Sequence, residues 1–192
     1  MSFLNEIDLY LRSKATLIVV VSPEEERIQE ELKTLCMNTG RSCIGWDIAD
    51  GFQSIIGDYA PGGGRDPLTA LEQIDKIDSK DPLIYVLRDF NEFWDNPTIK
   101  RKLRSIAERL KFTRKSIIIT AASASIPIDL IDETVIIDYP LPNLEQLEEV
   151  LNKLQLTPGV VIRLSDAGKE KLLQAALGLT AAQARRVFSK GI

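Results

Sequence analysis

The residues best suited to chemistry lie in turns that directly follow apolar, β-branched runs. The turn Ser22-Pro23-Glu24-Glu25-Glu26 follows Thr16–Val21, and Arg88-Asp89 follows Leu83–Leu87. Thr120-Ala121-Ala122-Ser123 ends a third run of this kind. In a parallel sheet the carboxyl ends of the strands meet at one edge, and ligands usually bind there. These turns, together with Asp50-Gly51 after a further strand, are therefore the positions at which a functional site is expected.

The first turn stands where a nucleotide-binding domain carries its phosphate loop. Such a loop needs glycines, so that backbone N–H groups can converge on phosphate, and a lysine that neutralises its charge. Here Pro23 lacks an N–H donor, and Glu24, Glu25 and Glu26 put carboxylates where an anion would have to bind. No Gly-x-x-x-x-Gly-Lys-Ser/Thr sequence occurs in the 192 residues. We therefore expect the scaffold of a phosphate-binding domain without its phosphate site.

The second turn resembles the end of a Walker B strand, which is apolar and finishes in acidic residues. That chemistry uses one carboxylate near Mg²⁺ and a second one to activate water. Arg88 occupies the first acidic position, where a cation repels Mg²⁺, and only Asp89 remains. We interpret Arg88 and Asp89 as ion-pairing residues at a strand end. Ser123 lies where a P-loop ATPase senses the γ-phosphate, and we favour a simple turn role for it.

A cation-rich run between residues 100 and 115 is the one clearly basic region of a chain whose net charge is −4. It includes Arg101 and Arg104, and Glu108 is its only acid. A solvated helix face is the favoured interpretation, followed by contact with an acidic partner or an adjacent subunit. Nucleic acid comes last, because binding of single strands needs several aromatic residues for stacking and only Phe112 is present.

An acidic patch provides a possible counterpart to this run. It consists of Glu24, Glu25 and Glu26 on one turn and Glu30-Glu31 on the next. Opposite charges on two surfaces of one chain can meet between two copies of that chain. We therefore include pairing across a subunit boundary among the hypotheses.

The composition excludes several other kinds of chemistry. The chain has no histidine, which rules out a Ser-His-Asp triad, an HExxH zinc site and a phosphohistidine. Cys36 and Cys43 are the only cysteines, and we expect reduced thiols in the cytosol because nothing indicates export. No apolar run approaches the roughly 20 residues that cross a bilayer. We therefore expect a cytoplasmic protein without a membrane segment.

The candidate turns require a sheet that places them side by side. Five strand-like runs alternate with amphipathic helices, apart from a short irregular crossover between the last two, and this pattern is typical of a doubly wound parallel sheet. The runs are Thr16–Val21, Ser42–Ile48, Leu83–Leu87, Ser116–Thr120 and Thr134–Ile137. Ser22 with Glu25, Asp66-Pro67 and Asn96-Pro97 are helix N-terminal signals. Asp50-Gly51 is expected to open a long loop through Arg65.

After Pro142 the pattern changes to helices alone. Asn143 with Gln146, Ser165, and Thr180 with Gln183 predict the starts of three helices in residues 143–192. We therefore expect an α/β core at 1–142 and a small helical subdomain at 143–192. The last predicted helix is about three turns long at the end of the chain, and we expect a fragment of a longer protein.

Several stretches together resemble one known family: TLIVVVSPEEER, GWDIADG, DPLTALEQI, PLIYVLRDFNEF and VIIDYPLPNLEQLEEVL. That family is the AAA+ ATPase first noted as a hypothetical reading frame in chloroplast genomes and shared with cyanobacteria. The resemblance covers nearly the whole chain. It implies a five-stranded, P-loop-NTPase-like (AAA-like) parallel sheet flanked by helices and a C-terminal helical subdomain similar to an AAA+ lid.

In that family an N-terminal AAA-like domain without a phosphate loop precedes a complete AAA+ module with Walker A and Walker B. The resemblance implies that this chain does not hydrolyse ATP and acts in assembly, regulation or partner binding. ATP and Mg²⁺ are then expected only in the following module, which is expected to be a partner together with neighbouring subunits. The family also suggests a role in regulating photosynthesis or carbon uptake, in the cytoplasm or the chloroplast stroma.

No catalytic, nucleotide-binding or metal-binding residue is transferred from the family to this chain. The residues proposed for interaction with a partner are Arg88, Asp89, Arg101, Arg104, Glu24 and Glu25. Two other functions stay open. A receiver-like signalling domain fits the acids after the first strand, Asp89 and Thr120, but the lysine expected after the fifth strand is missing. The other is a nucleotide-binding domain of atypical chemistry.

Overall fold

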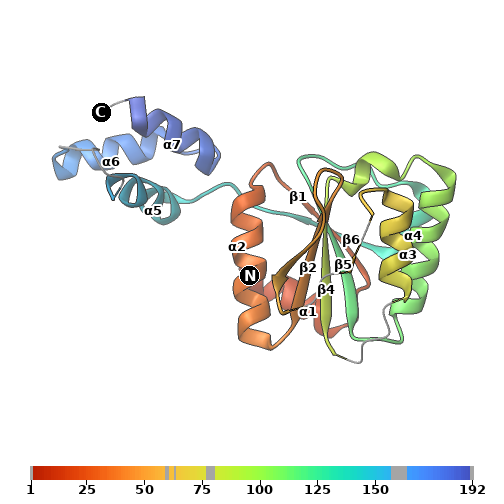
Figure 1. Cartoon of the computed structure of the whole chain (residues 1–192). Helices are drawn as coiled ribbons and strands as arrows, with labels where there is room; N and C mark the ends of the chain where they lie inside the picture. The colour runs from red at the N-terminus through yellow and green to blue at the C-terminus, as the bar shows by residue number, and fades with distance from the viewer. Residues whose placement is uncertain (1, 59–60, 63, 77–80, 157–163, 191–192) are drawn as a thin grey trace. The chain divides into compact units, whose positions relative to one another are not determined.

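The computed structural model describes residues 2–58, 61–62, 64–76, 81–156 and 164–190. The chain divides into two compact units, Met1–Tyr139 and Pro140–Ile192. The first unit is a sheet with helices on both faces, and the second is a group of three helices (Figure 1).

The first unit begins with α1 (Phe3–Arg12), β1 (Leu17–Val21), α2 (Glu25–Thr39), β2 (Ser42–Asp47), β3 (Gly51–Ile56) and α3 (Pro67–Lys76). It continues with β4 (Leu83–Arg88), the 3₁₀ helix η1 (Phe90–Phe93), α4 (Pro97–Leu110), β5 (Lys115–Ala121), η2 (Ile128–Glu133) and β6 (Thr134–Asp138). The second unit contains α5 (Leu144–Gln155), α6 (Asp166–Ala175) and α7 (Ala181–Lys190).

The sheet has six strands in the order β3-β2-β4-β5-β1-β6. The five predicted strands are present and parallel, so the predicted α/β class is confirmed. The prediction of only five strands is wrong, because β3 pairs antiparallel with β2 in the stretch that we expected to be a loop. Asp47 Oδ1 accepts hydrogen bonds from the amides of Ala49 (2.9 Å) and Asp50 (2.7 Å). Gly51 then has a φ of +73°, which glycine adopts without strain, and the chain reverses into β3.

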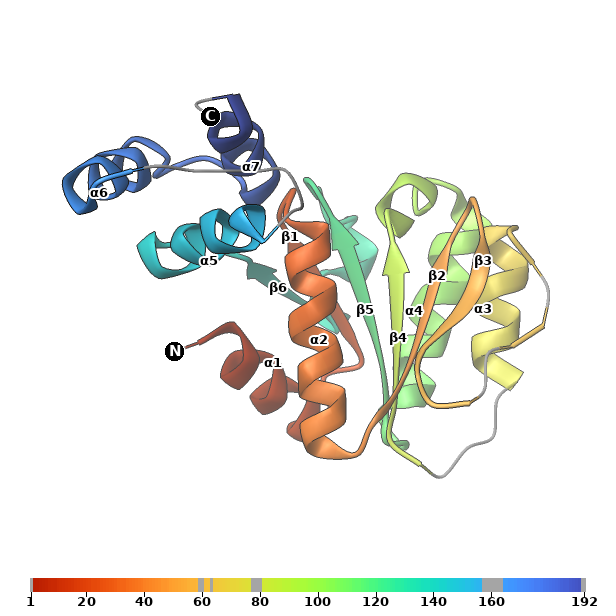
Figure 2. The same ribbon diagram turned by 60° about the vertical axis from the view of Figure 1, so that its left-hand side comes forward.

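Both faces of the sheet are covered, as the continuous apolar strands predict. Helices α1 and α2 lie on one face, and α3 and α4 lie on the other (Figures 1 and 2). Alternate residues of β1 enter the two cores: Leu17 and Val19 pack with α3 and α4, whereas Ile18 and Val20 pack with α1 and α2. All four side chains are fully buried, so β1 is the strand around which the unit is built.

The helix starts follow the predicted caps with one exception. Asn96 Oδ1 accepts the amide of Thr98 at 2.9 Å ahead of α4, and Asp66 Oδ2 accepts the amide of Thr69 at 2.7 Å ahead of α3. The predicted Ser22 cap is wrong. The amide of Ser22 donates to the Ala121 carbonyl oxygen at 2.9 Å, which holds Ser22 against the strand, and α2 begins later, at Glu25.

The second unit has a small core of its own. Leu147 and Leu151 of α5 pack with Leu173 of α6 and Phe188 of α7. The predicted capping box at the start of α5 is present, since the side chain of Asn143 accepts the Gln146 amide and the side chain of Gln146 accepts the Asn143 amide.

Candidate functional site

The structure brings the candidate turns together at the carboxyl edge of the sheet. The amide of Asp89 donates to the Thr120 carbonyl oxygen at 2.9 Å, which ties the end of β4 to the end of β5. On the other side of β1, the amide of Tyr139 donates to the Val21 carbonyl oxygen at 3.0 Å. The ends of β4, β5, β1 and β6 therefore form one continuous rim.

Arg88 is the central cation of this rim. Its Nη2 lies 2.6 Å from Asp47 Oδ2 at the end of β2, and its Nη1 lies 3.5 Å from Glu25 Oε1 in the first turn of α2. Asp89 is exposed, has a φ of +52°, and forms no ion pair with any described residue. The guanidinium of Arg88 thus binds carboxylates of the protein itself at the carboxyl end of β4.

The turn between β1 and α2 is also filled by the protein's own side chains. Glu24 is only 5% exposed, and its Oε2 lies 3.6 Å from Arg27 Nη1. The guanidinium of Arg27 lies over the ring of Tyr139, 4.9 Å from the ring centroid. Ser22 Oγ accepts the Glu24 amide at 3.3 Å. Glu25 and Glu26 lie in the first turn of α2, where negative side chains interact favourably with the positive end of the helix dipole.

Tyr139 closes this cluster at the end of β6. Its hydroxyl donates to Glu31 Oε1 at 2.6 Å, and its ring packs edge-on against Phe3 with centroids 4.6 Å apart. Burial and the hydrogen bond to Glu31 raise the pKa of Tyr139 far above its ordinary value. The phenol therefore stays protonated and keeps donating at any physiological pH. Glu31 and Tyr139 are 108 residues apart, so no local sequence pattern points to this contact.

The remaining predicted positions on the rim, Thr120 and Ser123, do not form a binding site with other described residues. Thr120 Oγ1 is buried and has no hydrogen-bond partner in the described part of the chain. Ser123 is exposed, and its carbonyl oxygen accepts Asn91 Nδ2 at 3.3 Å. Among the described residues no three His, Cys, Asp or Glu side chains are placed to hold a metal ion. In the same residues no helix has the length and apolar character needed to cross a membrane.

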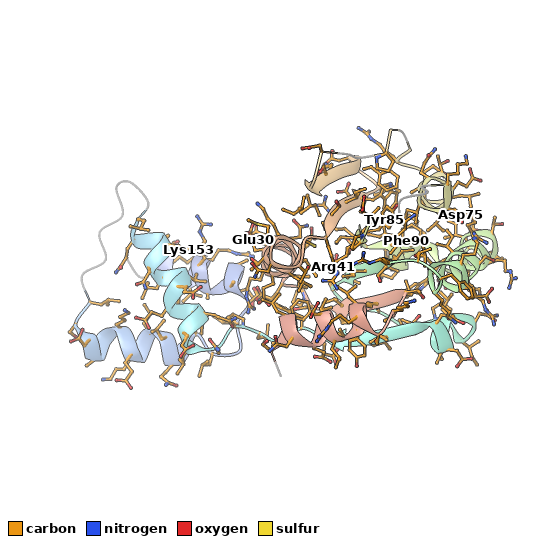
Figure 3. The ribbon with its side chains drawn as sticks, turned by 90° about the horizontal axis from the view of Figure 1, so that it is seen from below. Glu30, Arg41, Asp75, Tyr85, Phe90 and Lys153 are labelled. Carbon is orange, nitrogen blue, oxygen red and sulfur yellow. The ribbon has the colours of Figure 1, made fainter. Side chains whose placement is uncertain are left out.

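Acids of the same unit neutralise most of the basic run. Asp75 of α3, which is labelled in Figure 3, accepts Lys102 Nζ at 2.7 Å and Arg109 Nη2 at 2.6 Å. Partial burial opposes the ionisation of Asp75, but these hydrogen bonds outweigh it and hold its pKa below the ordinary value. Further pairs are Lys100–Asp129, Arg104–Glu108 and Lys111–Glu133. Arg101 is exposed and forms no ion pair within the described ranges.

The sequence also matches models of a known protein family. A model described as SpoVK-like AAA ATPase, N-terminal domain, matches residues 3–139. The chain belongs to the SpoVK-like AAA ATPase family. A model for the second domain of the same family matches residues 144–192 of this SpoVK-like chain. The resemblance to an N-terminal AAA-like region of an AAA+ ATPase is therefore confirmed.

Relatives of this SpoVK-like chain occur in algae. The AAA domain-containing protein ycf46 of Guillardia theta is 33% identical over 193 residues, which cover 99% of this chain and 37% of that protein. The protein of the same name in Trieres chinensis is 32% identical, with coverage of 99% and 38%. The chain therefore spans less than two-fifths of the length of these relatives.

Solved AAA structures share the fold of this SpoVK-like chain. Caenorhabditis elegans PCH-2 aligns with a TM-score of 0.61 and 14% identity, covering 94% of this chain and 59% of the PCH-2 chain. The FIGL-1 AAA domain, solved in complex with ADP, aligns with a TM-score of 0.59 and 11% identity, with coverage of 97% and 64%. At these identities the likeness shows an AAA fold and nothing about ligands.

Proposed function

We propose that this chain is the non-hydrolysing N-terminal part of a longer AAA ATPase, where it acts in assembly, regulation or partner binding. The observation that carries the proposal is the position of Arg88. Its guanidinium binds Asp47 and Glu25 on the rim where an active AAA module holds Mg²⁺ and the nucleotide. In this proposal the Arg88 guanidinium takes the place of the metal cation of a nucleotide site. The carboxylates of Asp47 and Glu25 take the place of the anionic phosphate groups.

The charges on the rim oppose nucleotide binding. A triphosphate at the start of α2 would face Glu24, Glu25 and Glu26, and a Mg²⁺ ion at the end of β4 would face Arg88. Two like unit charges 4 Å apart near a protein surface repel each other by about 4 kcal/mol when neither has a partner. The ion pairs of Glu24 with Arg27 and of Glu25 with Arg88 reduce this repulsion but do not reverse its sign at Glu26. The rim offers no glycine-rich backbone to offset this repulsion.

The rest of the function belongs to the longer protein. The relatives extend well beyond this chain, and we place ATP, Mg²⁺ and hydrolysis in a following AAA+ module. That module and neighbouring subunits are the proposed partners, since AAA family members typically oligomerise. A nucleic-acid partner is disfavoured because acids of the same unit pair with most of the basic run. The occurrence of relatives in algae supports a plastid location beside the cytoplasm as the alternative. A role in regulating photosynthesis or carbon uptake is part of the proposal and follows from the family resemblance alone.

An assay of phosphate release tests the absence of hydrolysis. The 192-residue chain is incubated with ATP and Mg²⁺, beside a matched Arg88→Ala variant. We expect both proteins to release phosphate at the rate of the protein-free blank, because the described rim provides no Mg²⁺ site. Saturable release by the unmodified chain would overturn the proposal, and a change of that release in Arg88→Ala, in either direction, would place catalysis on this rim.

A further inference from the structure

The amino-terminal edge of the sheet, opposite the rim described above, contains a second feature. A cavity of about 230 Å³ lies there, between the end of α1, the α2–β2 turn and the start of β5. Five cations line it: Arg12, Lys14, Arg41, Arg114 and Lys115. None of the described residues that line the cavity is acidic or aromatic. Figure 3 views the molecule from below and labels Arg41, which lies next to α1.

The backbone around the cavity is fixed by hydrogen bonds between segments that are distant in sequence. Ser116 Oγ donates to the Ala15 carbonyl oxygen at 2.8 Å, and the Leu83 amide donates to the Arg114 carbonyl oxygen at 3.2 Å. The Ser42 amide donates to the Pro82 carbonyl oxygen at 3.1 Å. The backbone that carries most of the lining cations is therefore held in place by the sheet, which lowers the cost of arranging their side chains around a ligand.

The cavity carries more positive charge than its surroundings neutralise. Asp8 of α1 forms ion pairs with two of the cations, at 3.0 Å from Arg12 Nε and 3.1 Å from Arg41 Nη1. Lys14 and Arg114 are exposed and form no ion pair with any residue that the structure describes. The C-termini of α1 and α2 each add about half a negative charge, so a positive excess remains even without Lys115. The α4 cations differ, because acids of α3, η2 and α4 itself pair with most of them.

We propose that this cavity binds a small anion with two or more adjacent phosphate groups, such as a diphosphate. Arginine guanidinium groups bind phosphate oxygens in a two-pronged manner, and a lysine adds a compact charge. Lys14, Arg41 and Arg114 approach the cavity from three segments, so they can surround a compact anion. An extended nucleic acid fits less well, because no described lining residue is an aromatic platform for bases.

The test is a calorimetric titration of the 192-residue chain with inorganic diphosphate at about 50 mM salt, where surface charges are weakly screened. The double variant Lys14→Glu/Arg114→Glu is compared with Lys33→Glu/Arg101→Glu. All four residues are exposed and form no ion pair within the described ranges, but only the first pair lines the cavity. We expect saturable binding that the first variant weakens at least tenfold and the second leaves within twofold.

Three results would overturn this proposal. The first is no saturable binding of diphosphate by the unmodified chain. The second is an equal loss in both double variants, which would indicate a general effect of net charge. The third is tighter binding of a single-stranded oligonucleotide than of diphosphate through Lys14 and Arg114, which would make the cavity part of a nucleic-acid surface. Each result concerns the amino edge alone. None of them tests the proposed absence of a nucleotide site on the opposite rim, which the phosphate-release assay tests.

Discussion

Replacement of Arg27 by methionine is expected to lower the free energy of unfolding by about 2–4 kcal/mol. The variant keeps the length of the side chain but removes the cation that lies 3.6 Å from the Glu24 carboxylate and over the ring of Tyr139. The Glu24 carboxylate, which is 5% exposed, then loses its ion pair. Removing one partner of a buried ion pair lowers the free energy of unfolding by more than the intact pair adds to it. Urea denaturation followed by fluorescence of the two buried tryptophans, Trp46 and Trp94, measures this loss.

Two further variants control for other causes of this loss. Arg101→Met removes an exposed cation of α4 that has no ion pair in the described structure, and we expect it to change stability by less than about 0.5 kcal/mol. Glu24→Gln in the Arg27→Met background removes the uncompensated charge, and we expect it to restore part of the stability. Equal denaturation midpoints for Arg27→Met and Arg101→Met would contradict the account of the α2 start.

Replacement of Phe90 by alanine is expected to destabilise the first unit by about 3–5 kcal/mol. Phe90 is fully buried directly after Arg88-Asp89, and its ring packs edge-on against Trp46 and Phe93, with centroids 5.4 Å and 5.7 Å away. The alanine variant leaves a cavity beneath the rim and removes both ring contacts. Phe90→Leu keeps most of the volume and is expected to cost less than about 1.5 kcal/mol.

Thermal unfolding by near-ultraviolet circular dichroism distinguishes these two variants of Phe90. The aromatic signal arises partly from the cluster of Trp46, Phe90 and Phe93. We expect a clear fall in melting temperature for alanine and a small one for leucine. If the alanine variant melts close to the unmodified chain, Phe90 contributes little to stability and the packing described for this part of the rim is wrong.

Local sequence signals were sufficient for several features that depend on residues close together in the chain. Asn96 and Asn143 cap their helices as predicted because a cap and its partner amides are two or three residues apart. Gly40 ends α2 in the left-handed conformation, with a φ of +63°, as a C-terminal glycine should. The five parallel strands were predicted from continuous apolar runs, which are distinctive when both faces are buried.

The sequence was less informative where two local signals competed. Asp50-Gly51 is also a hairpin signal, and the strand β3 that follows it was predicted as a loop. Only Gly51 of this strand is buried, so no long apolar run marked it. Ser22 and Glu25 matched a capping box, but Ser22 is held by the sheet through Ala121 instead. Competition of this kind is decided by tertiary contacts.

The partners on the rim depend on contacts between distant residues and could not be predicted. Arg88 was interpreted as an ion-pairing residue, but nothing in the sequence pointed to Asp47 as its partner. The pair forms because β2 and β4 are neighbours in the sheet, which brings the ends of both strands together. The positions of Arg27 and Tyr139 follow in the same way from the pairing of β1 with β6.

The central claim is that the turn between β1 and α2 cannot hold a triphosphate. A titration of the ¹⁵N-labelled chain with ATP and Mg²⁺, followed through the backbone amide signals of Ser22, Glu24, Glu25 and Glu26, tests it most directly. Because the readout is specific to these residues, phosphate bound at the amino edge does not interfere. The account predicts that these signals do not move at millimolar nucleotide. Saturable shifts that are confined to these amides would contradict it.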